Sequence, residues 1–120
     1  MPRQARLDAP GTLHHVLLRG MDRGPIVTDR EDGARFLARV GAVALATGTT
    51  LYAWALLPNH THLLLWSGAP GLPRFMRRLL TGYALTYNRR HTRGGHLFRN
   101  RYNSIVVEEE PYFRELQRQS

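Results

Sequence analysis

The 120-residue sequence predicts a single α+β domain in which four antiparallel strands form a sheet and two helices cover one of its faces. Two patterns in the sequence predict this class. Short apolar runs rich in β-branched residues are bounded by turn residues, and two longer segments carry apolar residues at helical spacing. The chain contains no internal repeat and no linker, and its length suits one core.

The first strand is expected at about Thr12 to Arg19, in the segment TLHHVLLR. After a loop rich in glycine, proline and aspartate, Thr28 or Asp29 would cap a helix that ends near Thr47. Its apolar face would consist of Phe36, Leu37, Val40, Val43 and Ala44.

The next two apolar runs, TTLYAWALL and HTHLLLW, are joined by Pro58-Asn59 and predict an antiparallel hairpin. A second helix is expected at about residues 72–90 and a fourth strand at roughly 102–108. Pro111 would lie in the first turn of a short terminal helix. The order βαββαβ is that of the ferredoxin-like plait, which RNA-recognition (RRM) modules share and which leaves one sheet face open for a ligand.

Positive charge is the strongest bulk property. The net charge is +8, the pI is near 11.2, and all 17 basic residues are arginine. No acidic residue occurs between Gly33 and Val107. This block repels itself unless a polyanion neutralises it, and arginine suits phosphate, so nucleic acid is the expected partner.

Other classes of function are excluded by what the sequence lacks. It has no cysteine, and therefore neither a disulfide framework nor a thiolate site. Its first residues contain no apolar signal segment, and no apolar run reaches the length of a membrane span. We expect a cytoplasmic protein that does not interact with membranes.

The pair His60 and His62 opens the third expected strand. Strand alternation places both imidazoles on one face, with their roots roughly 7 Å apart. Two imidazoles at this spacing suit one divalent ion, although two ordinary polar residues at a sheet edge would show the same spacing. Thr61 would point to the opposite face.

The segment WALLPNHTHLLL resembles the signature of IS200-like single-tyrosine (Y1) transposases, particularly the branch associated with repetitive extragenic palindromes (REP). GTLHHVLLRGMDRGPIVTDREDGARFL is similar to that branch's opening strand, Arg-Gly loop and helix start. LTGYALTYNRRHTRGGHLFRNRYNSIVVEEEPYFREL is similar to its later block. The resemblance covers nearly the whole chain.

The resemblance implies a DNA strand transferase with a His-hydrophobe-His (HUH) metal site. His60 and His62 would hold Mg²⁺ or Mn²⁺, which polarises a phosphate in single-stranded or hairpin DNA. A tyrosine hydroxyl would attack that phosphate, leaving a 5′-phosphotyrosine and a free 3′-OH. Thr61 replaces the family's apolar residue between the ligands.

The family's nucleophile falls at Gln119, so we expect this chain to lack the end of the catalytic helix. Tyr112, on the expected terminal helix, is the substitute candidate. Core packing is expected for the tyrosines of the second strand and second helix, and base stacking for the tyrosine that begins the fourth strand. These residues are Tyr52, Tyr83, Tyr87 and Tyr102.

Three groups of arginines are candidate DNA contacts. They are the loop pair Arg19 and Arg23, the helix set Arg74, Arg77 and Arg78, and the set around the Gly-Gly turn, Arg89, Arg90, Arg93, Arg99 and Arg101. Asn59 and Asn88 are expected to orient a ligand or cap a turn, and His14 and His15 to pack on opposite faces of the first strand.

Two alternative functions remain open from the sequence. A non-catalytic RRM-like module would bind nucleic acid on its open face with aromatic side chains. A metal-dependent phosphoesterase would need a carboxylate near His60, for which Glu108 and Glu109 are the candidates. A homodimer is also compatible with the sequence.

Overall fold

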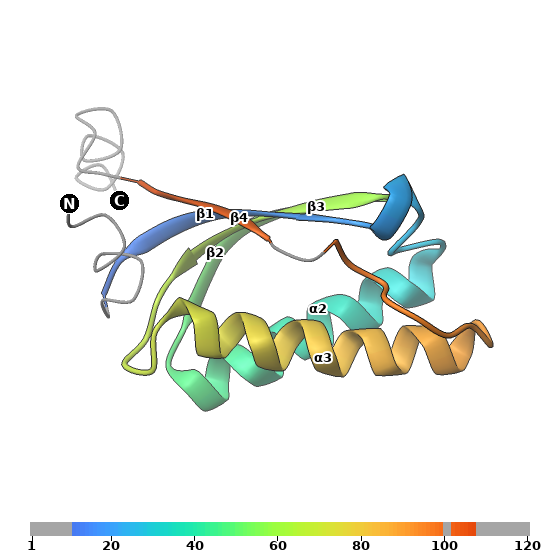
Figure 1. Ribbon diagram of the computed structural model, residues 1–120. Coiled ribbons are helices and arrows are strands. Elements are labelled where there is room, and N and C mark those ends of the chain that lie inside the picture. The colour runs from blue at the N-terminus through green and yellow to red at the C-terminus, as the bar shows by residue number, and fades with distance from the viewer. Residues whose placement is uncertain (1–10, 100–101, 108–120) are drawn as a thin grey trace.

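A computed structural model describes residues 11–99 and 102–107, and within them it confirms the predicted plait. The sheet is antiparallel with the order β2-β3-β1-β4, and both long helices lie on the same face of it (Figure 1). The elements are β1 (Leu13–Arg19), the short 3₁₀ helix η1 (Met21–Arg23), α2 (Arg30–Thr47), β2 (Thr50–Leu57), β3 (His60–Trp66), α3 (Leu72–Arg90) and β4 (Asn103–Val106).

The predicted signals at both ends of α2 are confirmed. The side chain of Asp29 accepts a hydrogen bond from the backbone N–H of Asp32 at 2.9 Å, which satisfies one donor of the first turn. Gly48 ends the helix in the left-handed conformation with a φ of 69°. The helix is therefore bounded by local chemistry at each end.

Strand alternation divides the central strands into a core face and an open face. Val16, Leu18, Leu63 and Leu65 are almost completely buried against the helices. Phe36 and Val40 of α2, together with Phe75, Leu79 and Tyr83 of α3, complete this core. His60 and His62 lie on the other face, as the alternation predicts, and are only partly buried.

Tyr83 ties α3 to the loop that follows η1. Its hydroxyl donates a hydrogen bond of 2.6 Å to the backbone carbonyl of Ile26, which is itself completely buried. Burial raises the pKa of the Tyr83 phenol far above its usual range, so this group stays protonated. The predicted packing role of Tyr83, and that of buried Tyr87, is confirmed.

The second strand contradicts one expectation. Tyr52 was expected to pack in the core, but 53% of its surface is exposed. Tyr52 lies in the edge strand β2 at the point where its register with β3 shifts, between Leu51 and Ala53. Trp54, which pairs with Leu63, is equally exposed.

The fourth strand is shorter than expected, because its paired residues run only from Asn103 to Val106. The expected terminal helix at Pro111 lies outside the described residues. Within residues 11–99 and 102–107, neither helix combines the length and apolar character needed to cross a bilayer.

We expect the stability of the protein to depend on pH because of His14. It is completely buried on the core face of β1, and neither ring nitrogen has a hydrogen-bond partner in the described part of the chain. Burial lowers the pKa of this imidazole below 6.5, so protonation favours the unfolded state. This group therefore costs no free energy of unfolding above about pH 6.5. Below that pH the free energy of unfolding falls as the pH decreases, by at most about 1.4 kcal/mol per pH unit.

Urea unfolding at pH 7.5 and pH 5.5 measures this effect in the wild type and in His14→Leu. The variant should lose less stability between the two pH values, because it has no buried imidazole to protonate. His96→Leu, which changes an exposed histidine, is the matched control and should behave as the wild type does. An equal loss in His14→Leu and wild type would contradict the prediction.

Candidate nucleic-acid interface

A hollow of about 490 Å³ lies on the open face of the sheet, where β1 ends and β3 begins. Polar and basic side chains form most of its wall. The residues that line it are Leu17, Arg19, Gly20, Arg23, Asn59, His60, His62 and Arg99.

Strand register and three backbone hydrogen bonds assemble this wall. Arg19 lies directly opposite His60, and Leu17 opposite His62, in the β1–β3 pair. The backbone N–H of Gly20 donates to the carbonyl of Asn59 at 3.0 Å, which holds the β2–β3 turn against the end of β1. Further along the chain, Arg99 N–H donates to the Arg19 carbonyl at 2.9 Å, and Met21 N–H to the Leu97 carbonyl at 2.9 Å.

The two imidazoles are close neighbours in the hollow. The ring centroids of His60 and His62 are 5.3 Å apart, and the rings are nearly perpendicular. Nδ1 of His60 donates a hydrogen bond of 3.0 Å to Oδ1 of Asn59, and Nδ1 of His62 is 3.1 Å from Nε2 of His15. Each ring therefore has its Nδ1 engaged.

The protonation state of His62 favours ligand chemistry. Desolvation by burial, and then repulsion from His15 and His60, lowers the pKa of His62 below 6.5. The ring is therefore neutral at pH 7 and has one nitrogen lone pair. A neutral imidazole is the form that binds a metal ion.

These residues fit a divalent ion as a partial site. His60 and His62 offer two nitrogens, and Nδ1 of each is within hydrogen-bond distance of a neighbouring side chain. Within the described residues, no group of three or more histidine or carboxylate side chains is arranged to hold a metal. Water or the oxygens of a bound phosphate would have to complete the coordination.

Three arginines line the hollow and are exposed: Arg19, Arg23 and Arg99. In the part of the chain that the structure describes, none of the three forms an ion pair. Arg19 and Arg99 also line an adjoining hollow of about 210 Å³ with Leu17 and Asn103. The basic surface therefore continues from β3 across β1 to β4.

The loop that carries Arg23 has an unusual backbone. Asp22 and Arg23 have φ values of 53° and 61°, in the left-handed region that non-glycine residues rarely adopt. A Cβ atom at Gly20 would lie 2.0 Å from the Gly24 carbonyl oxygen, so this tight turn requires glycine. The strained backbone holds the Arg23 side chain at the hollow.

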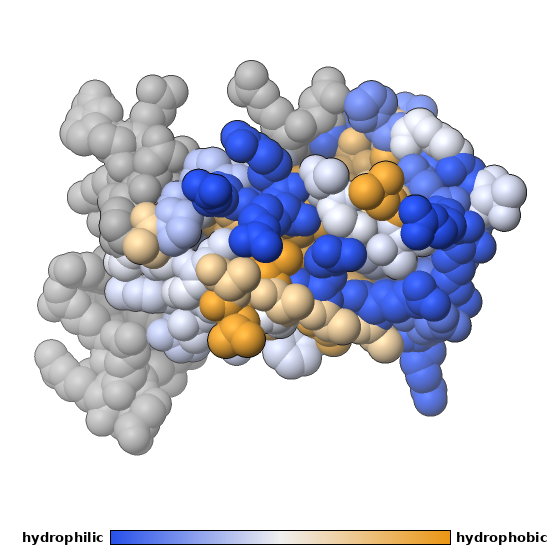
Figure 2. All heavy atoms as spheres, turned by 90° about the horizontal axis from the view of Figure 1, so that it is seen from below, coloured by the Kyte–Doolittle hydropathy of each residue, from blue (hydrophilic) through white to orange (hydrophobic). Residues whose placement is uncertain are grey.

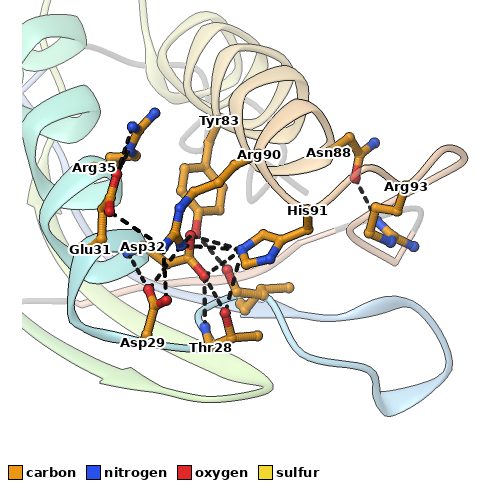
Figure 3. Close-up of polar contacts among 11 residues, drawn as sticks. Thr28, Asp29, Glu31, Asp32, Arg35, Tyr83, Asn88, Arg90, His91 and Arg93 are labelled. Carbon is orange, nitrogen blue, oxygen red and sulfur yellow. Dashed lines mark hydrogen bonds and ion pairs between the residues drawn. The ribbon is translucent and has the colours of Figure 1, made fainter.

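Arg90, by contrast, is neutralised within the protein (Figure 3). Its guanidinium lies 2.9 Å from a carboxylate oxygen of Asp29 and 2.7 Å from one of Asp32, whose side chain is 1% exposed. Arg90 and a backbone N–H lower the pKa of Asp29 to about 2. Burial alone would raise the pKa of Asp32, but hydrogen bonds from Thr28, Arg90 and His91 outweigh it and lower that pKa.

This network joins the first turn of α2 to the end of α3. The sequence places Arg90 in a segment without acids, but the fold brings it to the acids that precede that segment. We therefore assign Arg90 to the stability of the helix pair and leave it out of the candidate DNA surface.

The remaining predicted DNA contacts are spread over the molecule. Arg89 is exposed near the end of α3, and Arg93 in the next loop donates to the Asn88 side chain at 2.7 Å. Asn88 in turn donates to the Gly95 carbonyl at 3.0 Å, so its role is to brace this loop. The end of α3 and η1 lie at the same end of the molecule (Figure 1).

The helix set lies elsewhere. Arg74, Arg77 and Arg78 are exposed on the first half of α3, at the opposite end of that helix from Arg89. Figure 2 shows the helix side of the molecule, where hydrophilic residues cover most of the surface and apolar ones stand between them. These three arginines therefore do not line the hollow.

Several predicted site residues lie outside the described residues. They are Arg101, Tyr112, Gln119 and the carboxylates Glu108 and Glu109. Among the described residues, no tyrosine lines the hollow. The middle of the open face on β1 and β3 carries His15, Leu17, His62 and Leu64, so it presents no aromatic platform of the RRM type.

The contact between His15 and His62 was not predicted from the sequence, which indicated only that His15 packs on one face of the first strand. Strand alternation in β1 could have indicated that His15 lies on the same face as Arg19. The register that brings it to His62 had no signature in the sequence.

The comparisons with known proteins found relatives only at the level of structure. Neither a protein-family model nor a curated protein matches the sequence. A structure of the REP-associated tyrosine transposase bound to a REP hairpin matches with a TM-score of 0.68 and 13% identity, over 92% of this chain and 65% of that one. A presumed transposase from Deinococcus radiodurans R1 matches with a TM-score of 0.66 and 21% identity, over 89% of this chain and 87% of that one.

These matches show that the chain has the fold of both proteins. The chain spans less than two thirds of the length of the hairpin-bound transposase.

The strain at Arg23 generates a prediction. Arg23→Gly should leave the free energy of unfolding unchanged or raise it by up to about 1 kcal/mol, because glycine adopts this φ freely. The same change removes one of the candidate DNA contacts, so affinity for single-stranded DNA should fall. Urea unfolding and fluorescence anisotropy measure the two effects. A variant that is less stable than the wild type would show that the loop backbone is not strained.

Arg89 and Arg90 are adjacent and provide a matched pair. Arg90→Gln leaves the buried Asp32 carboxylate poorly compensated and should reduce the free energy of unfolding clearly more than Arg89→Gln does. Arg89→Gln removes an exposed charge and should change it by less than about 0.5 kcal/mol. Urea unfolding at pH 7 measures both free energies of unfolding. Equal decreases in the two variants would contradict the assigned role of Arg90.

Proposed function

We propose that this chain is a DNA-binding domain of the REP-associated Y1 transposase family. In this proposal it binds single-stranded or hairpin DNA on the open face of its sheet. His60 and His62 hold Mg²⁺ or Mn²⁺ at the hollow, and the surrounding arginines hold the DNA backbone.

One observation carries the proposal. The imidazole pair and three arginines that form no ion pair with any described residue line the same hollow on the uncovered face of the sheet. A phosphodiester bound there meets three guanidinium groups, each able to donate two parallel hydrogen bonds. The motif order and the shared fold support the same conclusion.

The protein's own residues prepare a phosphate for attack. Arg19 and Arg99 neutralise the charge of the phosphate oxygens, and the left-handed backbone at Arg23 presents a third guanidinium. A divalent ion bound by the imidazoles would supply Lewis-acid polarisation of a phosphate oxygen. Strand transfer would also need a nucleophilic hydroxyl. Its candidate is Tyr112, because the family's tyrosine position falls at Gln119, and both residues lie outside the described residues.

A hairpin is the favoured form of the DNA. The similar transposase is bound to a REP hairpin. In this chain, Arg89 and Arg93 at the end of α3 provide further basic groups at the same end of the molecule as η1 (Figure 1). We propose that these two arginines contact the paired stem while the hollow receives the adjoining single strand.

DNA binding to a hairpin with a single-stranded tail tests the proposal. Arg99→Gln should weaken binding by about tenfold, because one charged phosphate contact is lost. It should also reduce the slope of log K against log salt concentration by about 0.7. Fluorescence anisotropy from 50 to 300 mM salt measures both quantities.

Arg35→Gln is the matched control. Arg35 is exposed on α2 and pairs with Glu31 at 2.6 Å, so its removal should leave affinity and salt slope nearly unchanged. Mn²⁺ should strengthen binding in the wild type but not in His60→Ala. Equal effects of Arg99→Gln and Arg35→Gln would place the DNA elsewhere on the protein.

A further inference from the structure

We infer that His15 is a positioning residue for the metal ligand His62. Its Nε2 accepts a hydrogen bond from Nδ1 of His62 and thereby fixes the tautomer in which Nε2 of His62 carries the lone pair. This inference rests on the metal site of the proposed function.

The contact is built into the two central strands. His15 lies on β1 and His62 on β3, with Nε2 and Nδ1 3.1 Å apart. The ring centroids are 5.3 Å apart and the ring planes differ by only 17°, so the two imidazoles are nearly parallel. In the strand register His62 is opposite Leu17, which makes His15 its diagonal neighbour on the open face.

The direction of this hydrogen bond decides whether His62 can bind a metal through Nε2. A neutral imidazole has one N–H and one lone pair. When Nδ1–H of His62 donates to His15, Nε2 of His62 keeps its lone pair. The opposite direction would place the proton on Nε2 and block it.

His60 shows which direction the site uses. Its Nδ1 is 3.0 Å from Oδ1 of Asn59, and a carbonyl oxygen can only accept, so the proton of His60 is on Nδ1. His60 therefore offers Nε2. The equivalent arrangement at His62 requires His15 to be the acceptor, and then both rings offer the same atom to one ion.

An imidazole acceptor also suits the charge of the hollow. Orienting acceptors for metal-binding histidines are often carboxylates. A carboxylate at position 15 would add negative charge close to where the proposed phosphate binds. Among the described residues no carboxylate lines the hollow, so His15 orients His62 without adding negative charge near the DNA.

Two variants and one control separate the role of His15 from a structural one. His15→Leu cannot accept a hydrogen bond, whereas His15→Gln retains an acceptor oxygen. His96→Leu changes an exposed histidine away from the hollow. Thermal unfolding confirms that each variant is folded before the measurements are compared.

The first measurement needs no metal. Nitrogen-15 NMR of the metal-free protein should show Nδ1 of His62 protonated and Nε2 unprotonated in the wild type and in His15→Gln. In His15→Leu the proton should move largely to Nε2, which is the usual position in free imidazole side chains. A wild-type His62 protonated on Nε2 would overturn the inference.

The second measurement is Mn²⁺ affinity at constant pH by isothermal titration calorimetry. His15→Leu should bind Mn²⁺ about 10- to 100-fold more weakly. His15→Gln should recover most of the loss, and His96→Leu should match the wild type. Unchanged affinity in His15→Leu would overturn the inference while leaving the proposed metal site intact.

Pulsed EPR of the bound Mn²⁺ counts the coordinating nitrogens and excludes a direct role. Two are expected in the wild type and in His15→Gln. Three in the wild type and two in His15→Gln would make His15 a ligand and overturn its positioning role. A wild-type protein that binds no Mn²⁺ would instead overturn the proposed metal site itself.

Discussion

The antiparallel pairing of β1 with β3 is the constraint on which the rest of the structure depends. It places Val16, Leu18 and Leu63 beneath the helices and closes the core. The same register sets Arg19 opposite His60 on the other face. Since side chains alternate along a strand, a shift of one residue would exchange the core with the basic face. Stability and the candidate interface are therefore fixed by one set of backbone hydrogen bonds.

The fold gives the arginines different roles despite their similar chemistry. Arg90 is held between α2 and α3 by a buried carboxylate and two exposed ones, so its charge joins two helices. Arg19 and Arg99 are exposed at the hollow and form no ion pair with any described residue. Net charge alone does not distinguish these roles, because they depend on which acids the helices bring close.

Much of the fold could be predicted from the sequence because its signals are local. The Asp29 cap, the glycine at position 48 and the apolar stripe of α3 each specify a helix boundary or face from neighbouring residues. Alternation in HTHLLLW likewise predicts that His60 and His62 share the open face. The exposure of Tyr52 could not be predicted, since it depends on the order of strands in the sheet. The partners of Arg90 and His15 are distant in the sequence, so no spacing pattern reports them.

The composition of the hollow has a consequence for how metal and DNA would depend on each other. Its described walls offer an ion two imidazole nitrogens and no anionic oxygen, while three guanidinium groups lie nearby. A small hard cation held only by this wall lacks the oxygen ligands it prefers. A phosphate supplies those oxygens and gains a counter-charge in return. By thermodynamic reciprocity the cation and the DNA would then each raise the affinity of the protein for the other by the same factor. The two would therefore bind cooperatively.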